Sequence, residues 1–383
     1  MKGVQARASK QGRGMTNLTP QRVPYLDLNA QYASIREEVR AAVDEVFETS
    51  AYVLGPAVER FERDFAAFCA NEHCVAVNNG TAALHLTLAA LGIGPGDEVI
   101  TQANTFIATV AAILMTGARA VLVDVAPPTY GIDPEAVAAA ITPRTKAIIP
   151  VHIFGHPCDL DAIRQLGEAH GIPIIEDASQ AHGATYHGKP IGSGAIATFS
   201  FYPGKNLGAA GEGGAVVVRD AALARRLRLL RNHGSEKKYV HEAIGFNYRL
   251  EGIQGAVLGV KLRYLAAWTN ARARVAASYD TLLAEFERPQ LIADTTSAHH
   301  IYPVIIADRE KVSDRMKDDG IDTNVHYPIP CHLQPGYSAL GYARGAFPHS
   351  ERLAQMELSL PIFPELTDAQ AQRVATSLQL ALG

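Results

Sequence analysis

The chain has 383 residues, of which 48% are hydrophobic and 19% are charged. This length is sufficient for two domains with a large buried core, and the composition is ordinary for a globular protein. The formal net charge of −4 leaves no basic footprint, so a nucleic-acid partner is not expected. No apolar run approaches the ~20 residues that a membrane-spanning helix needs, so a membrane partner is not expected either.

The cysteine and histidine patterns indicate the compartment and argue against a metal site. The four cysteines form no paired CxxC pattern: Cys69, Cys74, Cys158 and Cys331. In a chain of this length they indicate a reduced, cytoplasmic protein and not a disulfide scaffold. His152 and His156 are four residues apart, but they fall at a predicted strand end before Pro157 and cannot share a helix face. No metal is therefore expected.

The N-terminal region is predicted to contain a leader and then two helices. Residues 1–22 are basic, carry no acidic side chain and lack the apolar core of a signal peptide, which predicts a disordered leader. Apolar residues at helical spacing predict a helix over residues 35–47. A second helix is expected after Gly55-Pro56, with Phe61 and Phe65 on its core face.

From residue 73 onward, short apolar runs alternate with helical patterns. Seven runs are predicted to be strands: Cys74–Val77, Glu98–Thr101, Ala120–Val125, Ala147–Ile153, Pro173–Glu176, Ala197–Phe201 and Ala215–Val218. Helical stretches lie between most of them: Ala82–Leu91, Ile107–Met115, Pro134–Ile141 and Leu160–His170. This alternation predicts an α/β fold with a mostly parallel seven-stranded sheet covered by helices. Ligands of such sheets gather at the loops that follow strands, so one sheet edge is expected to hold the site.

The C-terminal third is predicted to form a smaller α+β domain. Residues 250–286 have a long helical pattern and are expected to connect it to the sheet. Its next predicted elements are a strand, a helix and a strand, at Ile301–Ile306, Glu310–Asp319 and Thr323–His326. The final helix begins with a capping box, Thr367 with Gln370. The predicted organisation is a leader at 1–22, a large domain with an N-terminal arm at 23–250, and a connecting helix with the small domain at 251–383.

One stretch has the pattern of a reactive lysine. Ser200–Leu207 (SFYPGKNL) places Lys205 on a turn between two predicted strands, and the glycine-rich run Gly211–Gly214 follows it. Partial burial lowers the pKa of a lysine because it disfavours the ammonium form, and a neutral amine is the nucleophile that a Schiff base needs. A solvated lysine on a surface turn is the alternative that this stretch alone leaves open.

Two further stretches follow predicted strands. Asn79-Gly80-Thr81 lies where a strand gives way to a helix, and free backbone amides there favour an anion such as phosphate. Glu176–Gly183 (EDASQAHG) begins with acids at the end of a very apolar strand, where a carboxylate is costly unless it meets a cation. A helix cap or a structural salt bridge is the alternative. With Lys205 in the same chain, the expected cation is the protonated pyridine nitrogen of pyridoxal phosphate.

Together these motifs resemble the DegT/DnrJ/EryC1/StrS family of sugar aminotransferases, which are pyridoxal-phosphate enzymes of fold type I, the aspartate aminotransferase architecture. The resemblance runs from about Val23 to the C-terminus. It rests on the three stretches above and on two more, Gly245–Leu250 (GFNYRL) and His326-Tyr327-Pro328. It implies a pyridoxal 5′-phosphate cofactor, with pyridoxamine 5′-phosphate as its intermediate form, and a homodimer whose subunits share their active sites.

The resemblance also implies a role for each matching position. Lys205 would bind the cofactor as a Schiff base and then move the proton, Asp177 would pair with the pyridine nitrogen, and His182 would be either catalytic or structural. The other expected cofactor-binding residues are Gly80, Thr81, Phe106, Gln180, Ser200 and Asn247, the last of these reaching the phosphate in the neighbouring subunit. His326 and Tyr327 would line the substrate side.

The implied reaction moves an amino group from L-glutamate to a nucleotide-linked keto sugar. Ser200–Leu207 resembles the branch of the family that aminates C3 of a dTDP-linked 3-keto-6-deoxy sugar, but Ala209-Ala210 makes the signature mixed, and the C4 branch is the alternative. A dehydratase branch with histidine in place of the Schiff-base lysine is disfavoured by Lys205. A non-catalytic regulator is disfavoured by the presence of both Lys205 and Asp177.

Overall fold

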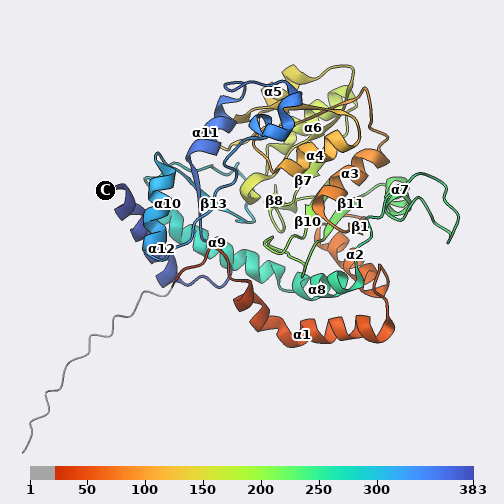
Figure 1. Cartoon of the computed structure of the whole chain (residues 1–383), viewed down its shortest axis with the longest axis horizontal. Coiled ribbons are helices and arrows are strands. Elements are labelled where there is room, and N and C mark those ends of the chain that lie inside the picture. Colours follow the sequence, from red (N-terminus) through yellow and green to blue (C-terminus); the bar gives the residue numbers. More distant parts are fainter. Residues whose placement is uncertain (1–21) are drawn as a thin grey trace, which may run out of the picture.

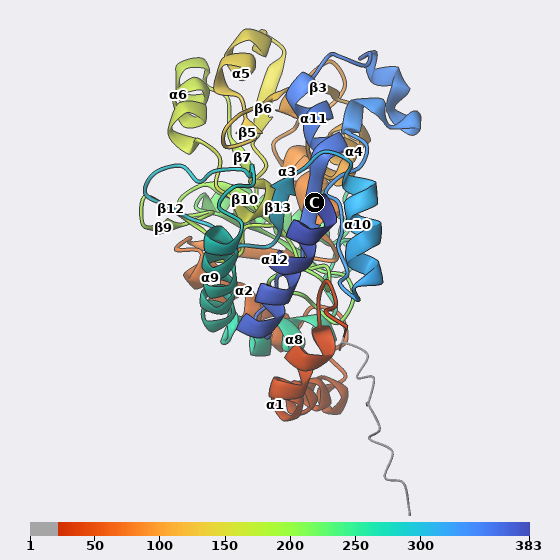
Figure 2. The ribbon, with the colours of Figure 1, turned by 90° about the vertical axis from the view of Figure 1, so that its left-hand side faces the viewer.

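The structure is a computed structural model, and it describes residues 22–383. Apart from Arg22, the predicted leader lies outside the described residues. None of the described helices is long and apolar enough to cross a membrane. Figure 1 shows the sheet strands among helices α2–α7, with α10 and α12 at one end of the molecule, and Figure 2 shows α6 and α4 on opposite sides of β7.

Seven strands form the central sheet, in the order β1-β11-β10-β7-β6-β2-β3. Their bounds are β1 His73–Val77, β2 Glu98–Gln102, β3 Arg119–Val123, β6 Thr145–Ile149, β7 Ile175–Asp177, β10 Ile196–Ser200 and β11 Gly214–Val218. Neighbouring strands are parallel except around β11, which runs antiparallel between β1 and β10. Two isolated parallel bridges join β6 to β7 and so unite a four-stranded and a three-stranded ladder. The predicted mostly parallel, seven-stranded sheet is confirmed.

Most of the helices around the sheet begin at a side-chain cap, whereas α2 and α4 begin without one. Their bounds are α1 Leu28–Thr49, α2 Pro56–Phe68, α3 Gly80–Ala90, α4 Ile107–Met115, α5 Pro134–Ala140, α6 Leu160–His170 and α7 Ala221–Arg231. The side chains of Asn79, Asp159 and Asp220 each accept a backbone N–H in the first turn of the helix that follows. Such a cap contributes about 1 kcal/mol. Almost every residue of α3 is buried, because the helix lies between the sheet and its neighbours α4 and α7.

The C-terminal elements have a hydrophobic core of their own, which also includes Val23. Their bounds are α8 Gly252–Leu262, α9 Leu265–Leu282, β13 Tyr302–Ile305, α10 Arg309–Asp318, α11 Pro348–Met356, β14 Glu357–Leu360 and α12 Asp368–Leu382. The capping box of Thr367 and Gln370 at the start of α12 is confirmed. The domain boundary at residue 250 stays a prediction.

Two expectations for this region are wrong in detail. The long helical stretch after residue 250 is two helices, α8 and α9, which are separated at Arg263-Tyr264. The strand expected at Thr323–His326 is absent, and only Asn324 bridges to Ser359. The backbone N–H of His326 donates to the side chain of Glu357 and not to a neighbouring strand. β13 pairs with β14.

Short elements complete the chain. They are β4 Val125–Ala126, β5 Gly131–Ile132, β8 Thr185–Tyr186, β9 Lys189–Pro190, β12 Thr295–Thr296 and the 3₁₀ turns Ile153–Gly155, Cys331–Leu333 and Pro335–Leu340. The pair β4–β5 and the small ladder β12-β8-β9 lie outside the central sheet.

Candidate active site

The lysine turn lies at the carboxyl edge of the sheet. Lys205 follows β10, which ends at Ser200, and α3 begins at Gly80 shortly after β1. β11 begins at Gly214, which pairs with Val77 of β1 on one side and with Ser200 of β10 on the other. The three segments therefore converge at the edge where open α/β sheets bind ligands.

Two glycines allow close backbone approach at this point. A Cβ on Gly80 would lie 2.6 Å from the Cβ of Ser200, and a Cβ on Gly214 would lie 2.4 Å from the backbone oxygen of Asn79. Any other residue at either position would push α3 away from the strands. The first turn of α3, with Thr81 as its second residue, therefore brings its free N–H groups and its positive dipole end to the sheet edge. This arrangement is a cradle for an anion.

Lys205 is held on a tight turn. Its backbone N–H donates to the oxygen of Tyr202 at 2.8 Å, and a Cβ on Gly208 would lie only 2.3 Å from the oxygen of Pro203. Burial lowers the pKa of Lys205 to about 8, although the negative charge of Asp177 opposes this shift. The alternative of an ordinary solvated lysine does not fit this environment, because the side chain is half-buried and its ammonium form is disfavoured.

Asp177 is a buried carboxylate that makes no direct ion pair among the described residues, although it interacts with Lys205 electrostatically. It is 4% exposed, its Oδ2 accepts from the hydroxyl of Thr109 at 2.9 Å, and its Oδ1 accepts from the N–H of Ser179 at 3.1 Å. None of the ion pairs among the described residues includes Asp177. Because a buried charge is costly when it is unpaired, a cationic ligand group is expected beside it.

The neighbouring acid, Glu176, is the one that makes a structural salt bridge. Its Oε1 accepts from Arg164 at 2.9 Å and its Oε2 accepts from the N–H of Gly192 at 3.1 Å. The ring of His152 lies 3.5 Å from the same carboxylate. Successive residues of a strand point to opposite faces, so β7 directs one acid into the protein and the other toward the lysine.

Gln180, Tyr327 and Phe106 form one connected group. The Oε1 of Gln180 accepts from the backbone N–H of Phe154 at 2.6 Å, and its Nε2 donates to the Tyr327 hydroxyl at 3.1 Å. The rings of Phe106 and Tyr327 lie 5.4 Å apart at a tilt of 42°. Phe106 is 53% exposed, so one face of its ring is available for contact with the ring of a ligand. The structure thus brings the loop after β2, the segment after β7 and the C-terminal loop together.

His326 lies beside Tyr327 and interacts electrostatically with the lysine. Its ring centroid lies 5.3 Å from that of Tyr327 and 6.0 Å from that of Tyr25. Burial, and then the charge of Lys205, lower its pKa to about 4. The imidazole is therefore neutral at physiological pH.

His182 is completely buried and is packed against Phe199 and Phe201, with ring centroids 5.3 and 5.7 Å away. Neither ring nitrogen has a hydrogen-bond partner among the described residues. Burial, and then the charge of Lys205, lower its pKa to about 3. A neutral ring without exposed atoms is typical of a packing role, and its catalytic role stays a prediction.

Asn247 lies apart from this group within the chain. Its side chain is exposed, its Oδ1 accepts from Arg249 at 2.8 and 3.1 Å, and its backbone pairs with Asn232 beyond α7. This position does not contradict a role in a neighbouring subunit, and that role stays a prediction.

The structure adds site residues that sequence reasoning missed. Thr109, in α4, donates to Asp177 and orients its carboxylate. The only signal for this role in the sequence is the position of Thr109 in the helix that follows the Phe106 loop. Asn206 directly follows the lysine; its Oδ1 lies 3.0 Å from the Nδ1 of His300, and its Nδ2 donates to the oxygen of Ala298 at 2.7 Å. Burial, followed by the charge of Lys205, lowers the pKa of His300.

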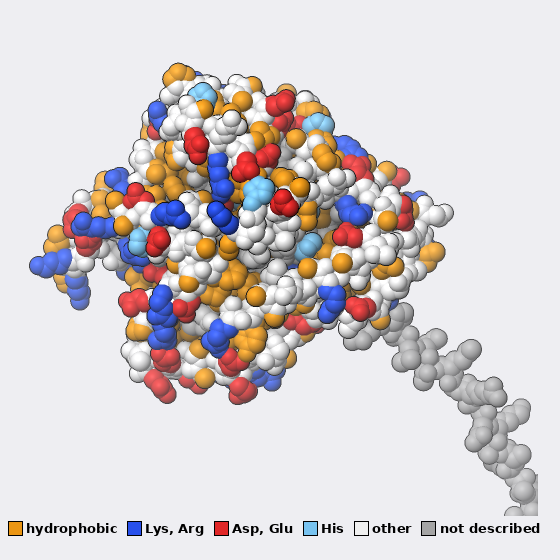
Figure 3. Space-filling model, turned by 180° about the vertical axis from the view of Figure 1, so that it is seen from behind, with side chains coloured by type: hydrophobic (Ala, Val, Ile, Leu, Met, Phe, Trp, Pro, Cys, Tyr) orange, Lys and Arg blue, Asp and Glu red, His pale blue; other side chains and the backbone are white. Residues whose placement is uncertain are grey.

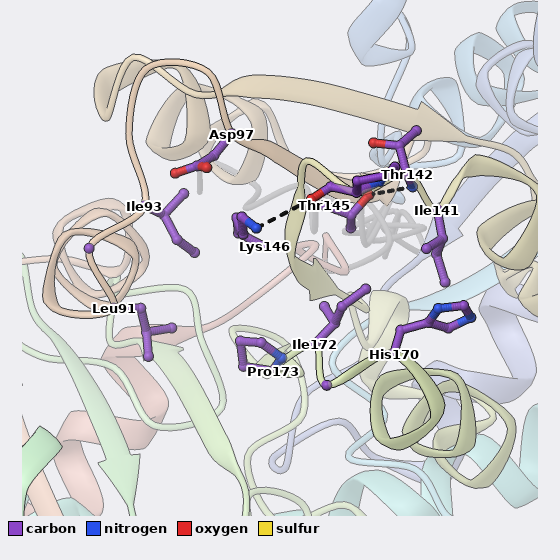
Figure 4. A pocket seen from close by; sticks show the side chains of 13 residues that line it. Leu91, Ile93, Asp97, Ile141, Thr142, Thr145, Lys146, His170, Ile172 and Pro173 are labelled. Carbon is purple, nitrogen blue, oxygen red and sulfur yellow. Dashed lines mark hydrogen bonds between the residues drawn. The ribbon is translucent and has the colours of Figure 1, made fainter.

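A cavity of about 710 Å³ lies at the opposite edge of the sheet. Figure 4 shows Lys146, Asp97 and His170 among the side chains that line it. It is located where β2 and β6 begin, whereas Lys205 follows the end of β10. Its size alone does not make it the active site, because neither Asp177 nor Lys205 lines it.

Comparison with known proteins identifies the class of enzyme. The model of the DegT/DnrJ/EryC1/StrS aminotransferase family matches residues 33–379. The chain belongs to this family. It is 47% identical over 362 residues to the dTDP-3-amino-3,4,6-trideoxy-alpha-D-glucose transaminase of Streptomyces venezuelae, which covers 94% of this chain and 96% of that protein.

Solved structures agree with this assignment. The crystal structure of DesV from S. venezuelae in complex with a ketimine intermediate matches with a TM-score of 0.92 at 47% identity, covering 94% of this chain and 98% of that one. NtdA from Bacillus subtilis with bound cofactor PMP matches with a TM-score of 0.88 at 33% identity, covering 94% and 85%. The predicted family, the fold type I class and the transaminase activity are confirmed.

The residues of this chain fit a pyridoxal-phosphate cofactor. The anion cradle at Gly80 suits a phosphate, and the unpaired carboxylate of Asp177 suits a protonated ring nitrogen. The lowered pKa of Lys205 suits an amine that binds a carbonyl group. The three features have the chemistry that the phosphate, the ring nitrogen and the aldehyde of one molecule require.

Proposed function

We propose that this aminotransferase moves an amino group from L-glutamate to C3 of a nucleotide-linked 3-keto-6-deoxy sugar. The observation that carries this proposal is the pairing of Lys205, with its lowered pKa, and the unpaired buried acid Asp177 at one sheet edge. The choice of C3 rests on similarity to the S. venezuelae transaminase and on the SFYPGKNL stretch. The dTDP nucleotide rests on the same similarity.

When bound, pyridoxal phosphate supplies the electron sink that allows a C–H bond next to an amine to break. The residues of this chain bind and orient it. Gly80, Thr81 and Ser200 would hold the phosphate, and Asp177, fixed by Thr109, would hold the positive ring nitrogen.

Lys205 would supply the amine that holds the cofactor through its carbonyl group, and its Nζ would then be the group that takes and returns the proton. Phe106 would pack against the cofactor, and Gln180 would supply a polar contact to it. His326 and Tyr327 line the side on which the sugar binds.

The assembly and compartment belong to the same proposal. The enzyme is a homodimer in which Asn247 reaches the phosphate of the neighbouring subunit. The exposed side chain of Asn247 supports this arrangement. The four free cysteines support a cytoplasmic, reducing setting.

Visible absorbance of the purified protein tests the proposal. A yellow band that bleaches with L-glutamate, with release of 2-oxoglutarate, is the expected result, followed by amination of a 3-keto sugar nucleotide. Lys205→Ala should lose turnover. Lys146 is an exposed lysine at the opposite edge, so Lys146→Ala should behave as the native enzyme.

A protein that stays colourless with added cofactor would overturn the cofactor assignment. A band indifferent to glutamate would overturn the choice of amino donor and revive the dehydratase alternative, and amination at C4 alone would overturn the position.

A further inference from the structure

Two polar side chains of β14 converge on the backbone and the ring of His326. Glu357 and Ser359 are two residues apart, so both point to the same face of the strand, and both are fully buried. The Oε2 of Glu357 accepts from the backbone N–H of His326 at 2.7 Å. Its Oε1 accepts from the hydroxyl of Ser359 in a short hydrogen bond.

The same hydroxyl oxygen lies 2.8 Å from the Nδ1 of His326. A hydroxyl has only one hydrogen. Because Ser359 directs that hydrogen to the carboxylate of Glu357, its oxygen can only accept from His326. The proton of the neutral imidazole must then reside on Nδ1, and Nε2 keeps its lone pair.

The rest of the ring is fixed by packing. The rings of Tyr25 and Tyr327 lie on two sides of it, at interplanar angles of 28° and 73°. Among the described residues Nε2 has no hydrogen-bond partner, so it is the nitrogen that remains for a ligand.

We propose that Glu357 and Ser359 are positioning residues that fix His326 as the Nδ1–H tautomer, so that Nε2 offers a hydrogen-bond acceptor to a sugar hydroxyl bound beside Lys205. The sugar rests on the proposed function, but the tautomer does not. A site that accepts a hydroxyl hydrogen distinguishes a sugar from its deoxy analogue, because the bound analogue covers Nε2 and leaves it unpaired.

Glu357, Ser359 and the His326 ring form a hydrogen-bond relay, and the direction of its hydrogen bonds can also reverse. Burial raises the pKa of Glu357 to about 7, although the bonds from Ser359 and the His326 N–H and the charge of Arg309 oppose this shift. A protonated Glu357 donates to Ser359, whose hydrogen then turns to Nδ1, and the ring carries its proton on Nε2. His326 changes from acceptor to donor without a change of its own charge.

Other charged and titratable groups face this relay. Tyr25 from the N-terminal arm and Tyr327 interact with Glu357, and Arg309 does so from α10. Lys205 and His300 interact with His326. Burial raises the pKa of both tyrosines, so neither titrates near pH 7, and the proton that reverses the relay is that of Glu357.

Nitrogen NMR of histidine-labelled protein tests the tautomer without any turnover. The His326 signals are assigned by their loss in His326→Gln. We expect Nδ1–H at pH 8 and Nε2–H at pH 5.5. Glu357→Gln should show Nε2–H at both pH values, because its amide donates to Ser359 as the protonated acid does. Ser359→Ala should remove the dependence on pH.

Ser377→Ala is the matched control. Ser377 is a buried serine of α12 that donates to the carboxylate of Asp319 at 2.7 Å, so its loss removes a similar bond away from His326. It should leave the tautomer and its pH dependence unchanged. Nε2–H in the native protein at pH 8, or a Glu357→Gln protein with the native tautomer, would overturn the proposal.

Kinetics provide the second readout. For the keto sugar, kcat/KM of Glu357→Gln should be about tenfold lower or more than that of the native enzyme at pH 8. This ratio should shrink toward pH 6, because the rise that Lys205 causes is common to both proteins. In Glu357→Gln, the rate at which L-glutamate converts the cofactor should change far less than kcat/KM for the keto sugar. If no sugar is turned over, the proposed substrate fails while the NMR result still decides the relay. A native pH profile in Glu357→Gln would refute its effect on the substrate.

Discussion

Two opposing effects set the reactivity of Lys205. Burial disfavours the ammonium form, whereas the negative charge of Asp177 favours it, and burial prevails, since the pKa falls from 10.5 to about 8. The lysine is therefore partly neutral near physiological pH, while an ordinary lysine would be almost entirely charged. The same acid that would hold the cofactor's ring nitrogen thus keeps the lysine from losing its proton at a still lower pH.

The rate at which cofactor-free protein captures pyridoxal phosphate should report this balance. Below pH 8 Lys205 is protonated, so the rate should rise about tenfold per pH unit and become constant above it. In Asp177→Asn the constant range should begin at a lower pH, because the charge that raises the lysine pKa is removed. Stopped-flow absorbance measures both curves, and identical curves would contradict the coupling.

Turnover of Asp177→Asn should fall by orders of magnitude, since a neutral pyridine is a poorer electron sink.

At the scale of elements, the site depends on how closely α3 approaches β10. The contact is made by backbone and small side chains, because a Cβ at Gly80 would overlap the Cβ of Ser200. Both partners are fixed: α3 is capped by Asn79 and buried on nearly all sides, and β10 is an inner strand. Neither element has room to move.

Gly80→Ala should therefore destabilise the fold and weaken phosphate binding together. Overpacking of this kind costs about 1–3 kcal/mol, and a displaced α3 no longer presents its N–H groups at the same place. Urea unfolding and the dissociation constant of pyridoxal phosphate measure the two effects.

Gly259→Ala in α8 is the control for that substitution. A Cβ there meets nothing within 4 Å, so it should raise helix stability by roughly 0.5–1 kcal/mol and leave cofactor affinity unchanged. A Gly80→Ala protein with native affinity would show that the close approach does not shape the phosphate site.

Elements that are encoded locally could be predicted from the sequence, and those that depend on distant partners could not. The seven strands are short apolar runs between helical patterns, and the capping box of α12 is a local motif. The failed strand at Thr323–His326 has strand-like residues, but a carboxylate 31 residues away, on Glu357, takes the N–H of His326. Thr109 and His300 were missed for the same reason, since only the fold brings them to Asp177 and Asn206.

At the scale of the whole molecule, one segment projects from the body. The hairpin that follows α7 extends to the right in Figure 1 and to the left in Figure 3. It carries exposed apolar side chains, with Tyr239 and Ile244 83% and 94% exposed. The hairpin also carries charged side chains, such as Lys237 and Lys238, and acidic and basic side chains are interspersed over the rest of the face drawn in Figure 3. A projecting segment with exposed apolar side chains, close in sequence to Asn247, fits a contact with a second copy of the chain.

Mixing two inactive variants tests whether subunits share their sites. In a heterodimer of Lys205→Ala and Asn247→Ala chains, one site would lack both residues, and the other would combine the intact Lys205 of one chain with the intact Asn247 of its partner. If association is random, half of the dimers are mixed and each has one complete site, so roughly a quarter of native activity should return. A mixture of Lys205→Ala and Asp177→Asn chains should recover nothing, because both residues belong to the same chain's site. Equal recovery in both mixtures, or none in the first with heterodimers demonstrated, would place Asn247 outside the neighbouring site.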